Sequence, residues 1–504
     1  MEQHRERVGC IAAQVKQFYD NQQTFRIYRG GATNSTRNHA LRGKDVVDTS
    51  ELHHVLRVDA EKRTILVETN VPMDRLVEAS LEHNLVPPVV MEFPGITAGG
   101  GYSGTSGESS SFKYGFFDRT ICRTEMVLAT GEIVFCSETE NADLFRGAAG
   151  AMGTLGVVTS VEVRLVQATK FVELTYHPVR SFREAVERTK GFTVLPDPDQ
   201  PDYVDGIMYS KNCGTIMTGR RTDEQKAGLS IARFSAPSDP WFSIHAQEHL
   251  KRSPAAVTEL LPLADYLFRY DRGCFWIGHT VFDFCWWLPD TGTTRKILDK
   301  FLHTRMLYVM GRSQPVNLQI IHDIAVPMSV SEDFMDWVTT TTEIWPLWLC
   351  PLKPSPQPTI HPRAKSEPGE LILNIGLWGP PKKLNVECYL EENKEIEDKL
   401  REIGGIKWGY SPNFCSVDEF WLDFDRKWYE ELRGKFCATS LPTICDKART
   451  EPDAVRKRWD DLTLKECLPF LIPGPTLWVM WKSWKSREWK WKQESTWMNW
   501  VPRK

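Results

Sequence analysis

Glycines and hydroxyl side chains gather in three stretches that could bind a phosphate. Residues 99–104 match the dinucleotide pattern Gly-x-Gly-x-x-Gly, but Pro94-Gly95 precedes them and GESSS, a poor helix former, follows at residues 107–111. A Rossmann turn needs a strand directly before it and a helix directly after it, so this match is a weak signal for that fold. Residues 29–36 and 150–156 add two more glycine loops, the first with the guanidinium of Arg29. Together the three loops favour a bound pyrophosphate.

A second pattern could bind zinc. Residues 245–249, HAQEH, match the inverted zinc-peptidase motif, in which two histidines on one helix face ligate the metal and Glu248 is the general base. Such short matches are common by chance, and no third ligand is marked. We therefore expect a solvated helix and no metal site. Four other histidines are expected to be structural or surface residues: His53, His54, His279 and His322.

Aromatic residues cluster at residues 275–276, 284–287 and 345–348. They could fill the core or line a large apolar pocket, and the sequence leaves both interpretations open.

The C-terminal tail has a composition of its own. Seven of the 19 tryptophans lie in residues 478–504, interleaved with lysine and arginine. The stretch from Trp478 to Trp500 suits a peripheral membrane contact. It also suits single-stranded nucleic acid, but nothing else in the chain favours that partner, and we expect none. The remaining interpretation is an unstructured extension or a misread exon end.

Composition narrows the class of protein. The 504 residues are 41% hydrophobic and 25% charged, with a net charge of −4, which excludes a mainly disordered chain and a basic nucleic-acid binder. The 12 cysteines are scattered without a Cys-x-x-Cys, which favours a reduced compartment. We expect neither a signal peptide nor a transmembrane helix in this chain.

The elements that must position these residues divide near Ala168, where composition shifts. Before it we expect a glycine- and serine-rich loop at residues 95–115, helices at 4–19, 72–84 and 140–149, and strands at 24–28, 55–58, 64–69, 124–129, 132–136 and 157–166. After it we expect helices at 181–190 and 420–427, a hairpin at 203–220, and strands at 171–176, 316–326, 343–352 and 371–377.

One of these stretches is similar to a known family. Residues 104–115, GTSGESSSFKYG, resemble the GTG-x-ESSS-x-KYG pattern of the delta-24 sterol reductases (24-dehydrocholesterol reductases), with Ser106 and Phe112 as local variation. The resemblance runs from about residue 5 to about residue 448, with supporting matches at residues 138–145, 153–156, 216–219, 345–351 and 418–421.

The resemblance implies an α+β flavoprotein of the vanillyl-alcohol oxidase/p-cresol methylhydroxylase (PCMH) type. Its parts would be an FAD-binding domain at 1–168, a substrate-cap domain at 169–450 and a Trp-rich basic extension at 451–504. Many relatives attach FAD through a histidine in the first glycine loop, and residues 29–36 hold none, so we expect non-covalent FAD. The residues implied for FAD binding are Arg29, Gly30, Gly31, Ala32, Thr33, Asn34, Ser35, Pro94, Gly95, Thr97, Gly99, Gly100, Gly101, Gly104, Thr105, Ser106, Gly107, Glu108, Ser109, Ser110, Tyr114, Gly153, Thr154, Gly156, Val157 and Val158.

The resemblance also implies a reaction, the reduction of the C24=C25 side-chain double bond of a sterol with NADPH, which would bind transiently. An isolated alkene is electron-rich, so a proton should add first at C24 and a hydride then at C25. That order needs a buried neutral acid and aromatic faces for the developing cation. Candidates for the acid are Glu419, Asp323 and Tyr410, while Glu108 and Tyr114 are expected to shape the flavin site.

Two departures from the family bear on location and function. Animal and plant members carry an N-terminal membrane segment, and this sequence begins just after the point where that segment would end. These members also lack a Trp-rich tail like that of residues 478–504. We expect the protein at the endoplasmic reticulum membrane or in the cytoplasm, with its oligomeric state open. Two other functions also stay open: an FAD-linked oxidase of a lipid, terpenoid or polyketide alcohol that uses O₂, and a non-catalytic membrane-associated scaffold.

Overall fold

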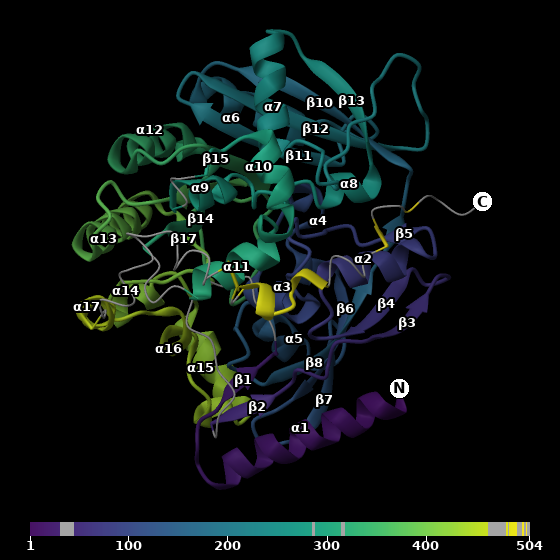
Figure 1. Ribbon diagram of the computed structural model, residues 1–504. Coiled ribbons are helices and arrows are strands. Elements are labelled where there is room, and N and C mark those ends of the chain that lie inside the picture. Colours follow the sequence, from purple (N-terminus) through teal and green to yellow (C-terminus); the bar gives the residue numbers. More distant parts are fainter. Residues whose placement is uncertain are drawn as a thin grey trace.

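Two antiparallel sheets form the framework of the molecule (Figure 1). The computed structural model describes residues 1–30, 45–284, 288–313, 318–461, 480–481, 483–490, 496–497 and 500. The smaller sheet has the strand order β3-β4-β8-β6-β7. All its strands precede Ala168: β3 (Val55–Asp59), β4 (Thr64–Glu68), β6 (Ile121–Val127), β7 (Ile133–Ser137) and β8 (Val157–Arg164).

Helix α1 (Glu2–Asp20) lies under this sheet at the foot of the view in Figure 1. Its buried side chains are His4, Val8, Ile11 and Val15, which are spaced to share one helix face. The other elements of this part are β1 (Arg26–Tyr28), β2 (Val46–Asp48), α2 (Met73–Leu81), β5 (Leu85–Val86), α5 (Ala142–Ala148) and β9 (Val166–Gln167). The helix and strand predictions before Ala168 are confirmed, although bounds shift by a few residues.

The larger sheet has eight strands in the order β13-β10-β12-β11-β15-β16-β14-β17. All of them follow Ala168: β10 (Phe171–Val179), β11 (Tyr203–Ser210), β12 (Cys213–Thr222), β13 (Val257–Pro262), β14 (Ile320–Pro327), β15 (Leu347–Leu352), β16 (Ile372–Gly379) and β17 (Ile406–Lys407). The outer face of the sheet is covered by three helices: α6 (Phe182–Thr193), α12 (Ser331–Thr342) and α13 (Val386–Ile403).

Strand β15 explains how this sheet joins two cores. Leu347 and Leu349 pack into the outer core under the helices, whereas Trp348 and Cys350 belong to the large core shared with the first part of the chain. Successive side chains of a strand point to opposite faces. All six residues of β15 are buried, so the sheet separates two apolar layers.

The glycine- and serine-rich segment at residues 95–115 is not the loop that the sequence predicts. It contains two short helices, α3 (Ala98–Gly104) and α4 (Ser111–Tyr114). Glycine disfavours helix in isolation, but here Thr97 caps α3, and close packing on Thr69 and Phe117 overrides the propensity.

The chain returns to the first part after β17. Trp408 Nε1 donates to the Thr105 carbonyl at 2.8 Å, and Tyr429 OH donates to Thr154 Oγ1 at 2.8 Å. These residues belong to a segment that holds α14 (Val417–Trp421), α15 (Arg426–Lys435) and α16 (Ile444–Ala448). Residues near 408–448 thus close the side of the first part that carries its glycine loops.

The remaining described helices connect these parts or follow them: α7 (Phe242–Arg252), α8 (Leu263–Leu267), α9 (Thr280–Phe284), α10 (Gly292–Ile297), α11 (Thr304–Ser313) and α17 (Pro452–Asp460). None of the helices in the described ranges is both long enough and apolar enough to cross a bilayer.

Parts of the Trp-rich tail lie against the molecule. Trp497 is 6% exposed, with its ring centroid 4.8 Å from that of Phe268, and Trp500 Nε1 donates to the Leu81 carbonyl at 2.8 Å. Trp481 and Trp484 are each 51% exposed. Trp478 and Trp491 fall outside the described residues.

Candidate functional site

The start of α3 forms a cradle with Arg29. Thr97 Oγ1 accepts a hydrogen bond from the Gly100 N–H at 3.1 Å, and Arg29 Nη1 lies 3.9 Å from where a Cβ on Gly100 would stand. No carboxylate among the described residues pairs with Arg29, and burial lowers the pKa of its guanidinium. A cation held in this way beside bare backbone suits a phosphate.

The glycines of this segment divide into two groups. A Cβ on Gly99 or Gly101 would overlap Thr69 or Met91, so these two glycines allow internal packing. Among the residues that the structure describes, none lies within 4 Å of a Cβ on Gly104, and a Cβ on Gly100 would meet Thr97 and Arg29 at 3.0–3.9 Å. The backbone at Gly100, next to Arg29, therefore leaves room for a ligand such as a pyrophosphate.

Glu108 organises the loop that follows. Its carboxylate accepts hydrogen bonds from Ser109 Oγ at 2.6 Å and from the Ser110 N–H at 2.9 Å. Burial raises the pKa of Glu108, and these serine contacts oppose the rise. The loop is tied to the larger sheet because the Val204 N–H donates to the Ser109 carbonyl at 2.8 Å. Glu108 thus shapes the site through its own loop.

The other residues expected at FAD lie around these loops. Pro94 and Gly95 are buried, Gly107 packs between Leu352 and Phe116, and Tyr114 OH accepts from Arg221 at 3.4 Å. The Ser106 N–H donates to the Gly101 carbonyl at 3.1 Å, and Thr105 ends α3. Gly30 has a φ of +83°, whereas Gly31, Ala32, Thr33, Asn34 and Ser35 fall outside the described residues.

The third glycine loop leads into β8. Thr154 Oγ1 donates to the Ala151 carbonyl at 2.7 Å, and the loop bends at Gly153, with a φ of +72°. A Cβ on Gly156 would lie 2.8 Å from the Val127 carbonyl, so that glycine permits close strand packing. Val157 and Val158 are buried in β8.

Asp323 and Tyr410, two of the three acid candidates, meet in the structure. Tyr410 OH donates to Asp323 Oδ2 at 2.7 Å, and Asn374 Nδ2 donates to Oδ1 at 3.1 Å. Burial raises the pKa of Asp323 and, more strongly, that of Tyr410. Both side chains nevertheless keep partial solvent accessibility.

Glu419, the third candidate, does not join them. It closes a capping box with Ser416 at the start of α14, and it pairs with Lys394 and Arg401. The Ser416 N–H and these cations lower its pKa to about 2. A carboxylate that is ionised at neutral pH cannot donate a proton, so this geometry argues against Glu419 as the acid.

Glu92 is a group that the sequence interpretation missed. It lies between β5 and Pro94-Gly95, and its Oε2 has no hydrogen-bond partner in the described structure. Burial raises the pKa of Glu92 to about 8, and the nearby charges of Asp323 and Glu108 add to the rise. The available signal was a lone carboxyl group in the otherwise apolar stretch at residues 85–96.

Aromatic rings adjoin these groups. Phe93, next to Glu92 in the chain, has its ring centroid 5.6 Å from Phe275 and 6.2 Å from Tyr308. Phe275 packs in turn on Trp378 at 4.5 Å and Trp348 at 5.2 Å, and all three are buried in the core. The partly accessible rings are those of Phe93 and Tyr308, so they are the ones that can face a ligand. Residues 285–287 fall outside the described ranges.

Comparison with known proteins gives the chain relatives over most of its length. Residues 8–137 match a family model described as an FAD binding domain. The human Delta(24)-sterol reductase is 30% identical over 410 residues, 79% of this chain and 76% of the relative. The Arabidopsis thaliana Delta(24)-sterol reductase is 29% identical, over 78% and 74%. A Delta(24)-sterol reductase homolog from Caenorhabditis elegans is 26% identical, over 88% and 87%.

Proposed function

Since the chain belongs to the Delta(24)-sterol reductase family, we propose that it is an FAD-dependent enzyme that reduces the C24=C25 side-chain double bond of a sterol, with NADPH as the electron donor. The observation that carries this proposal is the pair of acids Glu92 and Asp323, whose pKa values burial raises beside a group of aromatic rings. An electron-rich alkene requires such a proton donor, because hydride cannot attack it directly.

Glu92 is the best-suited donor of the proton. Its pKa of about 8 keeps the carboxyl group protonated at neutral pH, and none of the described residues forms a competing hydrogen bond with its Oε2. Asp323 and Tyr410 form a hydrogen-bonded pair that can return a proton to the site after each turnover. The partly accessible rings of Phe93 and Tyr308 would face positive charge that develops at C25.

FAD, when bound and reduced by NADPH, supplies the hydride. Arg29 and the backbone at Gly100 would hold its pyrophosphate. We propose that the flavin is non-covalent, since the loop at residues 29–36 contains no histidine. NADPH would visit the substrate face only transiently.

The proposal is tested by anaerobic visible spectra of the purified protein. Flavin absorbance should bleach with NADPH and return when desmosterol, a sterol with a C24=C25 double bond, is added. Glu92→Gln and Asp323→Asn should bleach normally but reoxidise with desmosterol at least about 100-fold more slowly. Glu419→Gln, which changes a carboxylate outside the cluster, should reoxidise at the wild-type rate.

Other outcomes would contradict the proposal in distinct ways. If NADPH does not reduce the flavin, but the enzyme turns over with O₂ and releases peroxide, the function is that of the FAD-linked oxidase. If the protein folds but binds no FAD, the remaining alternative is the non-catalytic scaffold.

We also propose that the protein touches a membrane, such as that of the endoplasmic reticulum, where sterols dissolve. Trp481 and Trp484 are exposed, and Lys485, Arg487 and Lys490 lie beside them in sequence. Sedimentation with vesicles that contain anionic lipid should pull the protein down. The double variant Trp481→Ala/Trp484→Ala should lose most of this binding, and equal binding by that variant would overturn the contact.

A further inference from the structure

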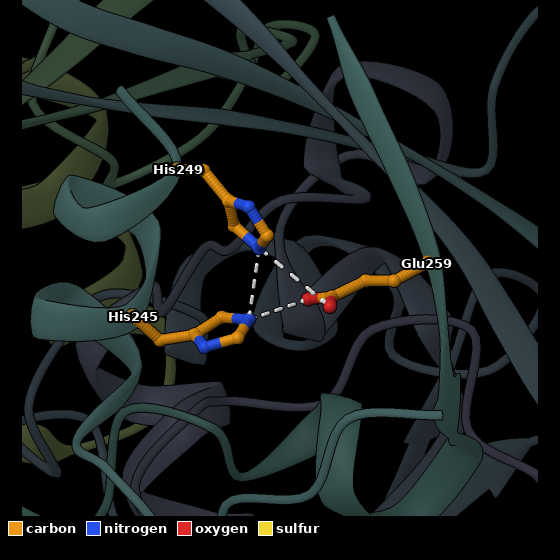
Figure 2. Close-up of side chains that lie close together, drawn as sticks. All are labelled: His245, His249 and Glu259. Carbon is orange, nitrogen blue, oxygen red and sulfur yellow. Dashed lines mark hydrogen bonds and ion pairs between the residues drawn. The ribbon is translucent and has the colours of Figure 1, made fainter. Parts of the chain in front are cut away.

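A cluster of two histidines and a glutamate lies away from the flavin site (Figure 2). Helix α7 places His245 and His249 one turn apart on the same face, and strand β13 places Glu259 opposite them. His245 Nε2 lies 2.8 Å from Glu259 Oε1, His249 Nε2 lies 3.6 Å from Oε2, and the two Nε2 atoms are 3.0 Å apart.

We propose that His245, His249 and Glu259 bind one divalent transition-metal ion, Zn²⁺ or a close analogue, which ties α7 to strand β13. Ligand atoms about 2.0–2.1 Å from a tetrahedral zinc stand roughly 3.4 Å from one another. The three separations in the structure, 2.8, 3.0 and 3.6 Å, bracket that value. Imidazole and carboxylate are also ligands that zinc prefers.

Hydrogen bonds alone satisfy this arrangement poorly. Glu259 Oε1 lies within hydrogen-bond distance of His245 Nε2, at 2.8 Å. An ionised carboxylate only accepts, so its contact with His245 requires a proton on His245 Nε2. That nitrogen then has no lone pair left for His249 Nε2 at 3.0 Å. A cation would use the lone pairs of all three groups at once.

The surroundings are those of a positioned ligand set. Tyr176 OH donates to Glu259 Oε1 at 2.7 Å and fixes the carboxylate, as outer partners of metal ligands do. The rings of Tyr176 and Phe234 pack on His249 and His245, with centroids 4.7 and 5.1 Å apart. Glu259 is 3% exposed, whereas His245 and His249 are 22% and 18% exposed, so an ion can enter from the solvent side.

The inverted zinc-peptidase interpretation of the same motif does not hold, because Glu248 is not a general base here. It pairs with Arg252 at 2.7 Å on the exposed side of α7. The third ligand, Glu259, comes from a strand ten residues further along the chain, where the helical motif could not reveal it. A site that joins a helix to an edge strand suits a structural role.

The test uses tag-free holoenzyme, stripped with a chelator and then titrated with ZnCl₂. We expect one zinc per chain by elemental analysis after desalting, and a rise in Tm on binding. The zinc affinity of His249→Ala and of Glu259→Gln should fall by more than roughly 10–100-fold, which is the loss expected when only an outer partner of a metal ligand is removed. Glu248→Gln, a matched change on the same helix, should bind as the wild type does.

Flavin content serves as the measure of folding and should be equal in all variants. If Glu259→Gln fails to retain flavin, His249→Ala carries the test. Zinc well below one equivalent in the wild type, or an unchanged affinity in a folded His249→Ala or Glu259→Gln variant, would overturn the proposal. None of these readouts depends on reductase activity.

Discussion

Glu92, Glu108 and Asp323 are carboxyl groups whose pKa values burial raises, but their partners differ. Glu108 is saturated by the serines of its own loop, and Asp323 by Tyr410 and Asn374. Glu92 keeps one oxygen without a partner. A proton donor must release and regain its proton, so the group with the fewest fixed hydrogen bonds is the one free to do so.

Glu92→Gln should make the protein more stable at high pH. A raised pKa in the folded state means that stability is fully present below the ordinary carboxyl value of about 4.3 and is lost as the pH rises through about 8. Glutamine cannot ionise, so Tm of the variant should exceed that of the wild type by several degrees at pH 9 and match it near pH 5.

Thermal unfolding across this pH range provides the check. Glu419→Gln is the opposite control, because the pKa of Glu419 is lowered, and its loss should reduce Tm at neutral pH. Equal melting of Glu92→Gln and wild type at pH 9 would mean that Glu92 ionises there without cost, which contradicts the raised pKa.

At this scale the sequence named two residues that prove to be in contact and missed a third. Asp323 and Tyr410 were both candidates, and they are hydrogen-bonded although they are 87 residues apart. Glu92 is missed because its raised pKa arises first from burial and then from the charges of Asp323 and Glu108, and only the tertiary fold produces that burial and brings those charges near. Glu259 is missed for the same reason.

At the scale of elements, α1 depends on one buried histidine. His4 Nδ1 lies 2.8 Å from Glu68 Oε1, and Nε2 lies 3.0 Å from Glu125 Oε1, on two strands of the smaller sheet. Burial opposes a charge on His4, but these two carboxylates overcome it and raise its pKa to about 9. The imidazolium is thus the electrostatic link between helix and sheet.

His4→Gln should therefore destabilise the protein by at most about 3–5 kcal/mol, because Glu125 would lose its imidazolium partner while Glu68 would keep its contacts with Arg7 and His54. In the wild type this stability is fully present below the ordinary histidine pKa of about 6.5 and is lost as the pH rises through about 9.

Denaturant titrations at pH 6 and pH 10 measure both effects. The difference between wild type and His4→Gln should shrink at the higher pH. Lys16→Gln, which removes only an exposed pair with Asp20, should leave stability unchanged. A constant difference between wild type and His4→Gln at both pH values would show that His4 is not ionised.

Helices and strands with a regular side-chain pattern are predicted from the sequence more accurately than elements without one. Alternation and helical spacing predicted the strands around β6 and β8 and the face of α1, since those patterns are local. Helix α3 was missed, because six of its seven residues are glycine, serine or alanine and its order comes from contacts with other segments.

At the scale of the whole molecule, the α+β class and the family are confirmed. The described residues of the tail include some that contact the rest of the molecule, unlike those of a free extension. Thr496 and Trp497 bond to Glu78 on α2, and Trp497 packs on Phe268. No periodicity in the sequence indicates these contacts, because they depend on surfaces that form only after folding.

Trp497→Ala should release the end of the tail. Removing a buried tryptophan costs about 3–5 kcal/mol where the site cannot collapse, so the tail should detach rather than the core unfold. Limited proteolysis should cut the tail faster in this variant, while the flavin spectrum stays unchanged. Trp481→Ala, at an exposed position, is the control, and equal cutting of Trp497→Ala and wild type would mean that Trp497 does not anchor the tail.

The return of residues 408–448 to the glycine loops has a consequence for synthesis on the ribosome. Trp408 and Tyr429 bond to Thr105 and Thr154 across about 300 residues of chain. At roughly 5–20 residues per second, most of the polypeptide emerges before the partners of these loops exist. The glycine loops of the nascent protein therefore lack these contacts until synthesis is nearly complete. Tight binding of FAD should then follow translation rather than accompany it.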